Sequence, residues 1–299
     1  METVVYKAVP GCEIRADVYP VVSNAPSPVL VIIHGGALIG GNRKGIRPVL
    51  RDVCTRDGIA QVSIDYRLAP ETKLPEIVQD VDDAFRWVRG EGARRFNLDP
   101  VRVGVLGWSA GGYLSLLAAC RVNPRPRVVV SFYGYGDIAA PWYAEPDPFY
   151  CQQPAVSREE ALASVGSEPV SDPPSGKDRF RFYLYCRQQG LWPKEVAGFD
   201  PRTQRAELDQ YCPLRNVSAA YPPTLLFHGT ADTDVPYQQS VDMALALAKN
   251  DVPHELVTID GGGHGFDGGV KFADLQAVQS SPGVLAFERT LSYLRQYLQ

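Results

Sequence analysis

The sequence predicts one α/β domain, residues 1–299, with a mostly parallel sheet covered by helices on both faces. Short apolar runs of strand length recur along the chain, and helical patterns separate most of them. This alternation is typical of parallel sheets, whose strands are connected through crossover helices. The runs span residues 28–33, 59–64, 101–106, 127–132, 223–228 and 254–259. Two shorter segments, near residues 3–9 and 12–19, are expected to form an antiparallel edge.

Two segments have the spacing of amphipathic helices. In residues 74–90, Pro75 suits the first turn, apolar residues recur on one face, and Gly90 is expected to end the helix. Residues 284–298 repeat the pattern near the end of the chain. Both helices are expected to pack an apolar stripe against the sheet.

The alternation stops between residues 137 and 217, a stretch rich in proline and aromatic residues. Because it is too aromatic for a disordered linker, we predict an inserted lid or cap over the carboxyl ends of the strands, where open parallel sheets bind ligands. The alternative is an inserted packing element that does not touch the substrate. The aromatic residues expected to bind substrate are Trp142, Tyr183 and Trp192, together with Trp108 outside the insertion.

Composition narrows the classes of function. The 299 residues carry a formal net charge of -4, which gives no basic face for nucleic acid. No run approaches the ~18 apolar residues of a membrane span, and the start lacks a secretory signal, so a cytoplasmic location is expected. The six cysteines include no C-x-x-C pair, which argues against structural zinc. The spacing leaves open a disulfide between two of Cys151, Cys186 and Cys212.

Residues 107–111 read Gly-Trp-Ser-Ala-Gly, directly after an apolar run and directly before a helical pattern. A serine between two glycines at a strand-to-helix turn is typical of a nucleophile held in a strained, exposed position. The alternative is a glycine-rich turn that only starts a helix. Because both the strand and the helix are predicted here, Ser109 is the candidate nucleophile.

A serine hydroxyl needs a base, and the chain has four histidines. His34 and His228 precede glycines at strand ends and are expected to be structural, and His254 starts a strand. His264 lies in the glycine-rich loop after the last strand, where it can reach Ser109, so it is the predicted base.

The base in turn needs a carboxylate that orients it. Asp232 and Asp234 both follow the strand at 223–228. Asp232 is favoured, because the carboxylate of Asp234, next to Val235-Pro236, is expected to cap the following helix. The order serine, acid, histidine is that of α/β-hydrolases.

The amides of Gly35 and Gly36, after the strand at 28–33, are expected to form an oxyanion hole with the amide of Ala110. The alternative is a plain connecting turn. A phosphate-binding loop is not expected, because residues 40–45 lack the required ending.

Five motifs in this order resemble the α/β-hydrolase superfamily: residues 34–36, 65–71, 107–112, 228–232 and 263–266. Within it, they resemble esterases and lipases related to hormone-sensitive lipase and to the feruloyl and acetyl-xylan esterase group. The resemblance implies Ser109, Asp232 and His264 as the catalytic triad. It also implies that Asp65 and Arg67 brace the oxyanion loop.

The sequence departs from the hormone-sensitive-lipase pattern at two positions in these motifs. Ala37 stands where many relatives have a third glycine, and Trp108 stands where that group usually has aspartate. The group's helical cap is not seen before the first strand, so the insertion is expected to supply the lid.

These residues predict a serine hydrolase that cleaves small carboxylic esters through an acyl-enzyme, with no metal or organic cofactor. One alternative is an amidase or formamidase that acts on small arylamides with the same triad. The other is a hydrolase-fold binding protein without catalysis.

Overall fold

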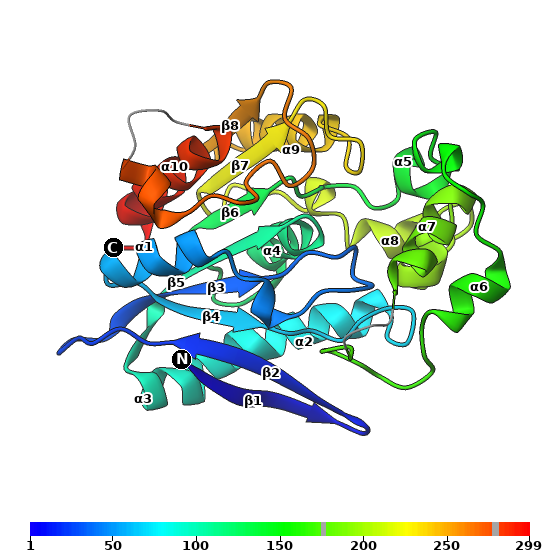
Figure 1. The fold of residues 1–299 in the computed structure, drawn as a ribbon. Coiled ribbons are helices and arrows are strands. Elements are labelled where there is room, and N and C mark those ends of the chain that lie inside the picture. Colours follow the sequence, from blue (N-terminus) through cyan, green and yellow to red (C-terminus); the bar gives the residue numbers. More distant parts are fainter. Residues whose placement is uncertain (175–177, 277–280) are drawn as a thin grey trace.

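The computed structural model describes residues 1–174, 178–276 and 281–299, and Figure 1 shows the fold. Within these residues the strands form one eight-stranded sheet, in the order β1-β2-β4-β3-β5-β6-β7-β8. The pairs β1–β2 and β2–β4 are antiparallel, and all other pairs are parallel. The strands are β1 (Glu2–Val9), β2 (Cys12–Tyr19), β3 (Ser27–Ile33), β4 (Ala60–Ile64), β5 (Leu98–Trp108), β6 (Val129–Phe132), β7 (Thr224–Gly229) and β8 (His254–Ile259).

The predicted sheet with its antiparallel edge is confirmed, with differences at the ends of strands. β5 begins at Leu98, ahead of its apolar run, because backbone pairing of Leu98 with Ser27 of β3 does not require apolar side chains. It also runs on to Trp108, directly before the turn of the predicted nucleophile Ser109. The end of β5 therefore fixes where the Ser109 turn begins.

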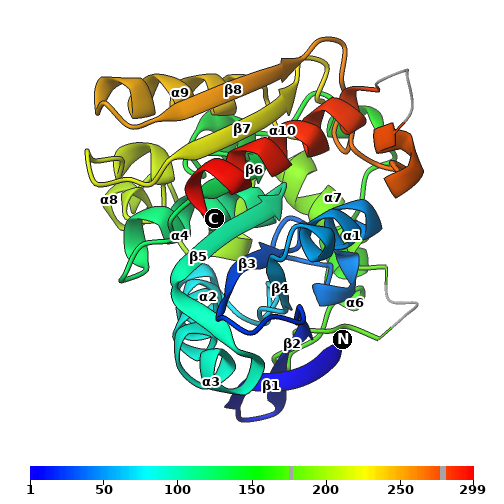
Figure 2. The same ribbon diagram turned by 90° about the vertical axis from the view of Figure 1, so that its left-hand side faces the viewer.

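Helices cover both faces of the sheet, as Figures 1 and 2 show. Leu30 and Ile32 of β3 face the side packed by α1 (Pro48–Arg56) and α10 (Pro282–Tyr297). The alternate residues Val29, Val31 and Ile33 face the side of α2 (Leu74–Trp87), α4 (Ala110–Arg121) and α9 (Gln238–Lys249). All of β3 is therefore buried, as expected for a central parallel strand.

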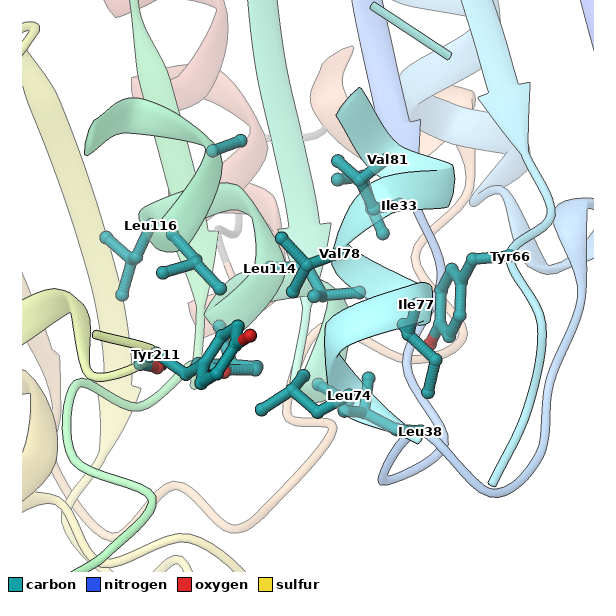
Figure 3. Close-up of a cluster of buried hydrophobic side chains, with 14 of the residues drawn as sticks. Ile33, Leu38, Tyr66, Leu74, Ile77, Val78, Val81, Leu114, Leu116 and Tyr211 are labelled. Carbon is teal, nitrogen blue, oxygen red and sulfur yellow. Dashed lines mark hydrogen bonds between the residues drawn. The ribbon is translucent and has the colours of Figure 1, made fainter. Parts of the chain in front are cut away.

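The second face holds the larger apolar core, part of which is drawn in Figure 3. Ile77, Val78 and Val81 of α2 belong to this core together with Ile33 of β3 and Leu114 of α4. The predicted stripe of residues 74–90 is thus buried as expected. The packing fixes α4, and with it the turn that holds Ser109.

Gly90 does not end the second helix, contrary to prediction. α2 ends at Trp87, a wider π-helical turn continues over Val88–Gly92, and α3 (Ala93–Phe96) follows. Asn97, which has a left-handed φ of 53°, ends the helical segment instead. Asparagine tolerates this conformation, so the residue that ends the helix is an asparagine and not the predicted glycine.

The insertion follows β6 and precedes β7. Its α-helices are short except for α7: α5 (Pro141–Ala144), α6 (Arg158–Ala163), α7 (Phe180–Gln189) and α8 (Arg205–Asp209). Figure 1 shows them, in green to yellow, at the end of the molecule toward which the parallel strands point. Residues 175–177 of the predicted insertion lie outside the described residues.

No helix in the described part of the chain combines the length and apolar character needed to cross a membrane.

Candidate active site

Ser109 occupies a sharp turn between β5 and α4, with φ 53° and ψ -120°. The flanking glycines are required by space: a Cβ at Gly107 would lie 2.1 Å from the Gly111 carbonyl oxygen, and one at Gly111 would lie 2.1 Å from that of Ile33. The Ser109 amide donates to Phe132 of β6 at 2.9 Å. The turn is therefore strained, tightly packed and anchored to the neighbouring strand.

The loop after β3 lies directly beside this turn. A Cβ at Gly35 would lie 2.9 Å from the Trp108 carbonyl oxygen and 3.3 Å from Ser109 Cβ, so only glycine allows the approach. Gly36 has φ 110°, which favours glycine. Ala110 is the first residue of α4, so its amide has no acceptor within the helix. The three predicted oxyanion donors thus come from two adjoining turns.

His264 and Asp232 meet in space although 32 residues separate them. Nδ1 of His264 lies 2.8 Å from Oδ2 of Asp232. Oδ1 of Asp232 accepts the amides of Asp234 and Val235, both at 2.9 Å. Because a carboxylate can only accept, Nδ1 carries the proton and Nε2 is the atom left for chemistry.

The surroundings of this pair favour its charged forms. Burial of Asp232 opposes ionisation, but hydrogen bonds from His228, His264 and the Val235 amide outweigh burial and lower the pKa of Asp232. Burial also lowers the pKa of His264, but the hydrogen bond to Asp232 and the charge of Asp234 raise it more, so the net pKa lies above its ordinary value. The carboxylate is therefore ready to stabilise an imidazolium.

Asp234 does not cap the following helix, contrary to prediction. α9 begins at Gln238 after Tyr237, which makes no side-chain cap, and the Asp234 carboxylate turns toward the insertion. Its Oδ1 accepts from the hydroxyls of Tyr150 and Tyr183 and from Arg187. Its Oδ2 lies 3.4 Å from Nε2 of His264. An aspartate at position 234 would suit a helix cap as well as it suits these contacts, so the residue type alone does not decide between them. Only the fold shows which donors reach the Asp234 carboxylate.

A cavity of about 520 Å³ opens at this point. Its wall includes Ser109 and His264, and also Gly35 and Gly36 from the oxyanion loop. No hydrogen bond joins the Ser109 hydroxyl to His264 among the contacts of the described residues. The predicted nucleophile, base and amide donors thus share one cavity, and His264 faces Asp234.

The four predicted substrate-binding aromatics divide into two pairs. Trp108 and Tyr183 line the cavity. Trp142 and Trp192 are not among its lining residues, and their contact with substrate stays a prediction. Trp192 is fully buried, stacks on Tyr143 and donates to the Ala37 carbonyl at 3.1 Å. Trp142 stacks on the other side of Tyr143, and its indole donates to Asp137.

A buried cluster behind the histidine loop was not predicted from the sequence. Asp267 accepts from the Trp108 indole at 2.9 Å, from the Tyr133 hydroxyl at 2.6 Å and from Arg47 at 2.9 Å. The Tyr133 ring lies 4.5 Å from the His264 ring, centre to centre. Trp108, which stands where relatives have aspartate, therefore serves as a donor to a carboxylate from another loop. The only sequence signal was an aspartate three residues after His264.

The expected bracing by residues 65–71 is only partly found. Asp65 holds the end of the oxyanion loop, because it accepts the Arg43 amide at 2.7 Å and its guanidinium at 2.6 Å. Arg67 pairs with Asp80 of α2 instead, so its predicted contact is wrong. Glu71 was not singled out, yet it forms a two-pronged pair with buried Arg179, which also donates to Ile39 of the loop.

All six cysteines are free thiols, so the disulfide left open between Cys151, Cys186 and Cys212 is not present. Burial raises the pKa of the Cys120 thiol to about 11, which makes it a poor nucleophile. Within the described residues, no group of three or more His, Cys, Asp or Glu side chains is placed to hold a metal ion.

Residues 30–268 match a family whose description is the alpha/beta hydrolase fold, and the chain belongs to this family. The superfamily resemblance is thus confirmed. The chain is 30% identical over 351 aligned positions to the non-reducing polyketide synthase ausA of Aspergillus calidoustus. That alignment covers 100% of this chain and 14% of the synthase. The synthase Preu6 of Preussia isomera is 27% identical, with 89% of this chain and 14% of the synthase covered. The chain therefore spans only a small part of these relatives.

Solved structures share the whole fold. A Staphylococcus aureus protein of unknown function has a TM-score of 0.78 at 22% identity, and all of both chains is covered. An alpha/beta hydrolase superfamily protein from Enterococcus faecalis has a TM-score of 0.73 at 25% identity, with 95% of this chain and 96% of that chain covered. An acetyl ester-xyloside bifunctional hydrolase from Caldicellulosiruptor lactoaceticus has a TM-score of 0.70 at 21% identity, with 99% and 96% covered.

Proposed function

We propose that this chain is a serine hydrolase that cleaves carboxylic esters through an acyl-enzyme on Ser109. The observation that carries the proposal is the common cavity of Ser109 and His264, with His264 hydrogen-bonded to Asp232. The esterases among the structural neighbours support the ester as the substrate bond. No observation favours the amidase, so it remains an alternative for the same experiment.

In the proposed reaction the Ser109 hydroxyl attacks the ester carbonyl carbon, and Nε2 of His264 takes its proton. The negative charge on the former carbonyl oxygen is met by the amides of Gly35, Gly36 and Ala110. Asp232 stabilises the imidazolium, which then protonates the departing alcohol. Water, activated by His264, attacks the acyl-enzyme and releases the acid and the free serine.

We also propose that the insertion, residues 137–217, acts as the cap of this site. Arg179, Phe180 and Tyr183 of the insertion line the same cavity as Ser109. The volume of about 520 Å³ lies within the range of small-molecule sites. Because the curated relatives are polyketide synthases, polyketide-like aryl esters are the acyl donors to try first.

The test is an activity screen over alkyl esters, aryl esters, thioesters and matched anilides, with Ser109→Ala as control. We expect ester hydrolysis by the wild type and a loss of several orders of magnitude in Ser109→Ala. A fluorophosphonate probe should label the wild type and leave Ser109→Ala unlabelled. Faster cleavage of anilides than of matched esters would favour the amidase, and a folded wild type that takes no label would favour a binding protein.

A further inference from the structure

Asp234 is a second carboxylate at the proposed base, on the side opposite Asp232. Asp232 meets Nδ1 of His264 at 2.8 Å, and Asp234 meets Nε2 at 3.4 Å. Nε2 is the atom that must take the proton of Ser109 in the proposed reaction. The structure therefore places an anion beside the atom that the reaction needs.

The insertion fixes Asp234 in this position. Arg187, buried to 1% exposure, donates to Oδ1 of Asp234 at 2.9 Å. Two tyrosine hydroxyls, of Tyr150 and Tyr183, donate to the same oxygen. Three donors on Oδ1 hold this oxygen in place and leave Oδ2 directed at the imidazole.

The contact between Asp234 and Nε2 is attractive for only one protonation state of the ring. An imidazolium carries a proton on Nε2 and is attracted to the carboxylate. A neutral ring that donates Nδ1–H to Asp232 presents a lone pair at Nε2, which the carboxylate repels and a serine hydroxyl can donate to. Protonation therefore favours Asp234 as the partner of His264, and deprotonation favours Ser109.

We propose that Asp234 is a positioning residue that competes with Ser109 for Nε2 of His264 and so sets the pH at which the proposed hydrolase becomes active. The inference rests on the proposed function for its effect on turnover, but not for its effect on His264. Because Asp234 favours the imidazolium, it delays activity to higher pH. The insertion, through Arg187 and the two tyrosines, controls the base as well as the cavity.

Other charged and titratable groups also act on His264, and Asp234→Asn leaves their residue types unchanged. Asp232 and Asp267 are anions of the flanking loops, Tyr133 packs on the ring, and two cations lie one contact further away. These groups are Asp232, Asp267, Tyr133, Arg187 and Arg47. Their combined effect is common to the wild type and to each variant that retains them.

The direct test is an NMR titration of the histidine side chains in the wild type and in Asp234→Asn. The chain has four histidines, and the His264→Gln spectrum assigns the signal. Loss of an opposite charge at this distance should lower the pKa of His264 by about one unit or more. Because the neutral ring is active, kcat/KM of Asp234→Asn should rise about tenfold on the acid side of the wild-type profile and converge with it at high pH.

The matched control is Asp147→Asn. Asp147 is the other carboxylate partner of Arg187, and among the described residues its carboxylate makes no hydrogen bond or ion pair with His264. The Asp147→Asn substitution weakens the contacts of the same arginine, Arg187, and should leave the pKa of His264 unchanged. If the pKa of His264 falls as much in Asp147→Asn as in Asp234→Asn, the arginine cluster as a whole, and not the Asp234 carboxylate, controls that pKa. This result would overturn the proposal.

An unchanged His264 pKa in folded Asp234→Asn would also overturn the proposal. Should that variant not fold, the double variant Asp234→Asn with Arg187→Met removes both charges of the pair. A smaller fall in the pKa of His264 is then expected, because loss of the more distant Arg187 cation offsets part of the loss of Asp234. The titration needs no substrate. A wild type that hydrolyses no ester would therefore contradict the proposed function while the NMR result still decides the role of Asp234.

Discussion

The two walls of the cavity are built in different ways. On the sheet side, Ser109, Gly35 and Asp232 lie at the ends of buried parallel strands, and backbone hydrogen bonds and glycine-only contacts fix their turns. On the insertion side, stacked aromatic rings surround buried arginines, and Arg187 lies within 6 Å of four ring centres. The first wall depends on backbone geometry and the second on side-chain partners. Changes in the first should alter chemistry, and changes in the second should alter stability or selectivity.

Asp232→Asn, a change in the sheet-side wall of the cavity, should give the largest effect, which is a loss of kcat. The amide would favour the wrong imidazole tautomer, so kcat should fall by roughly 10³ to 10⁴ with little change in fold. Steady-state kinetics and circular dichroism measure both properties. A fall of less than about tenfold would show that Asp232 does not orient the base.

Glu71→Gln should give the next largest effect, which is a loss of stability. It removes the carboxylate partner of an arginine in the insertion. It leaves Arg179, whose side chain is 6% exposed, without its carboxylate. Breaking a buried pair in this way costs about 3 to 5 kcal/mol. Urea unfolding measures the loss. Glu13→Gln is the control, because its pair with Arg15 is about half exposed (55% and 44%) and contributes about 0 to 1 kcal/mol. Equal losses in the two variants would contradict the buried role.

Phe180→Ala should give the smallest effect and change selectivity alone. Phe180 lines the cavity and is 51% exposed, so it contributes little to the core. Loss of ring packing is worth about 0.5 to 1.5 kcal/mol, so the preference for aryl over short alkyl esters should fall roughly twofold to tenfold. Leu162→Ala, at a residue of α6 that is 41% exposed and not part of the cavity wall, is the control. An unchanged preference in Phe180→Ala would remove this face of the insertion from the binding site.

The sequence alone determined the sheet and the turns at its edge. Each predicted strand run is a strand, because a buried parallel strand needs a continuous apolar segment that a single sequence displays. The glycines around Ser109 and at Gly35 and Gly36 could also be predicted, because close backbone approaches and left-handed φ values admit few other residues. Spacing likewise brought Asp232 and His264 to the same edge, since both follow neighbouring strands.

Only the tertiary structure decided which long polar side chains meet. Arg67 pairs with Asp80, Arg179 with Glu71, and Asp234 with Arg187 rather than with a helix end. Trp192, expected at the substrate, is buried and donates to the Ala37 carbonyl of the loop after β3. Backbone patterns are local, so the sequence carries them directly. Partners of aromatic and ionic side chains depend on the path of an irregular insertion, whose contacts span up to 159 residues along the chain.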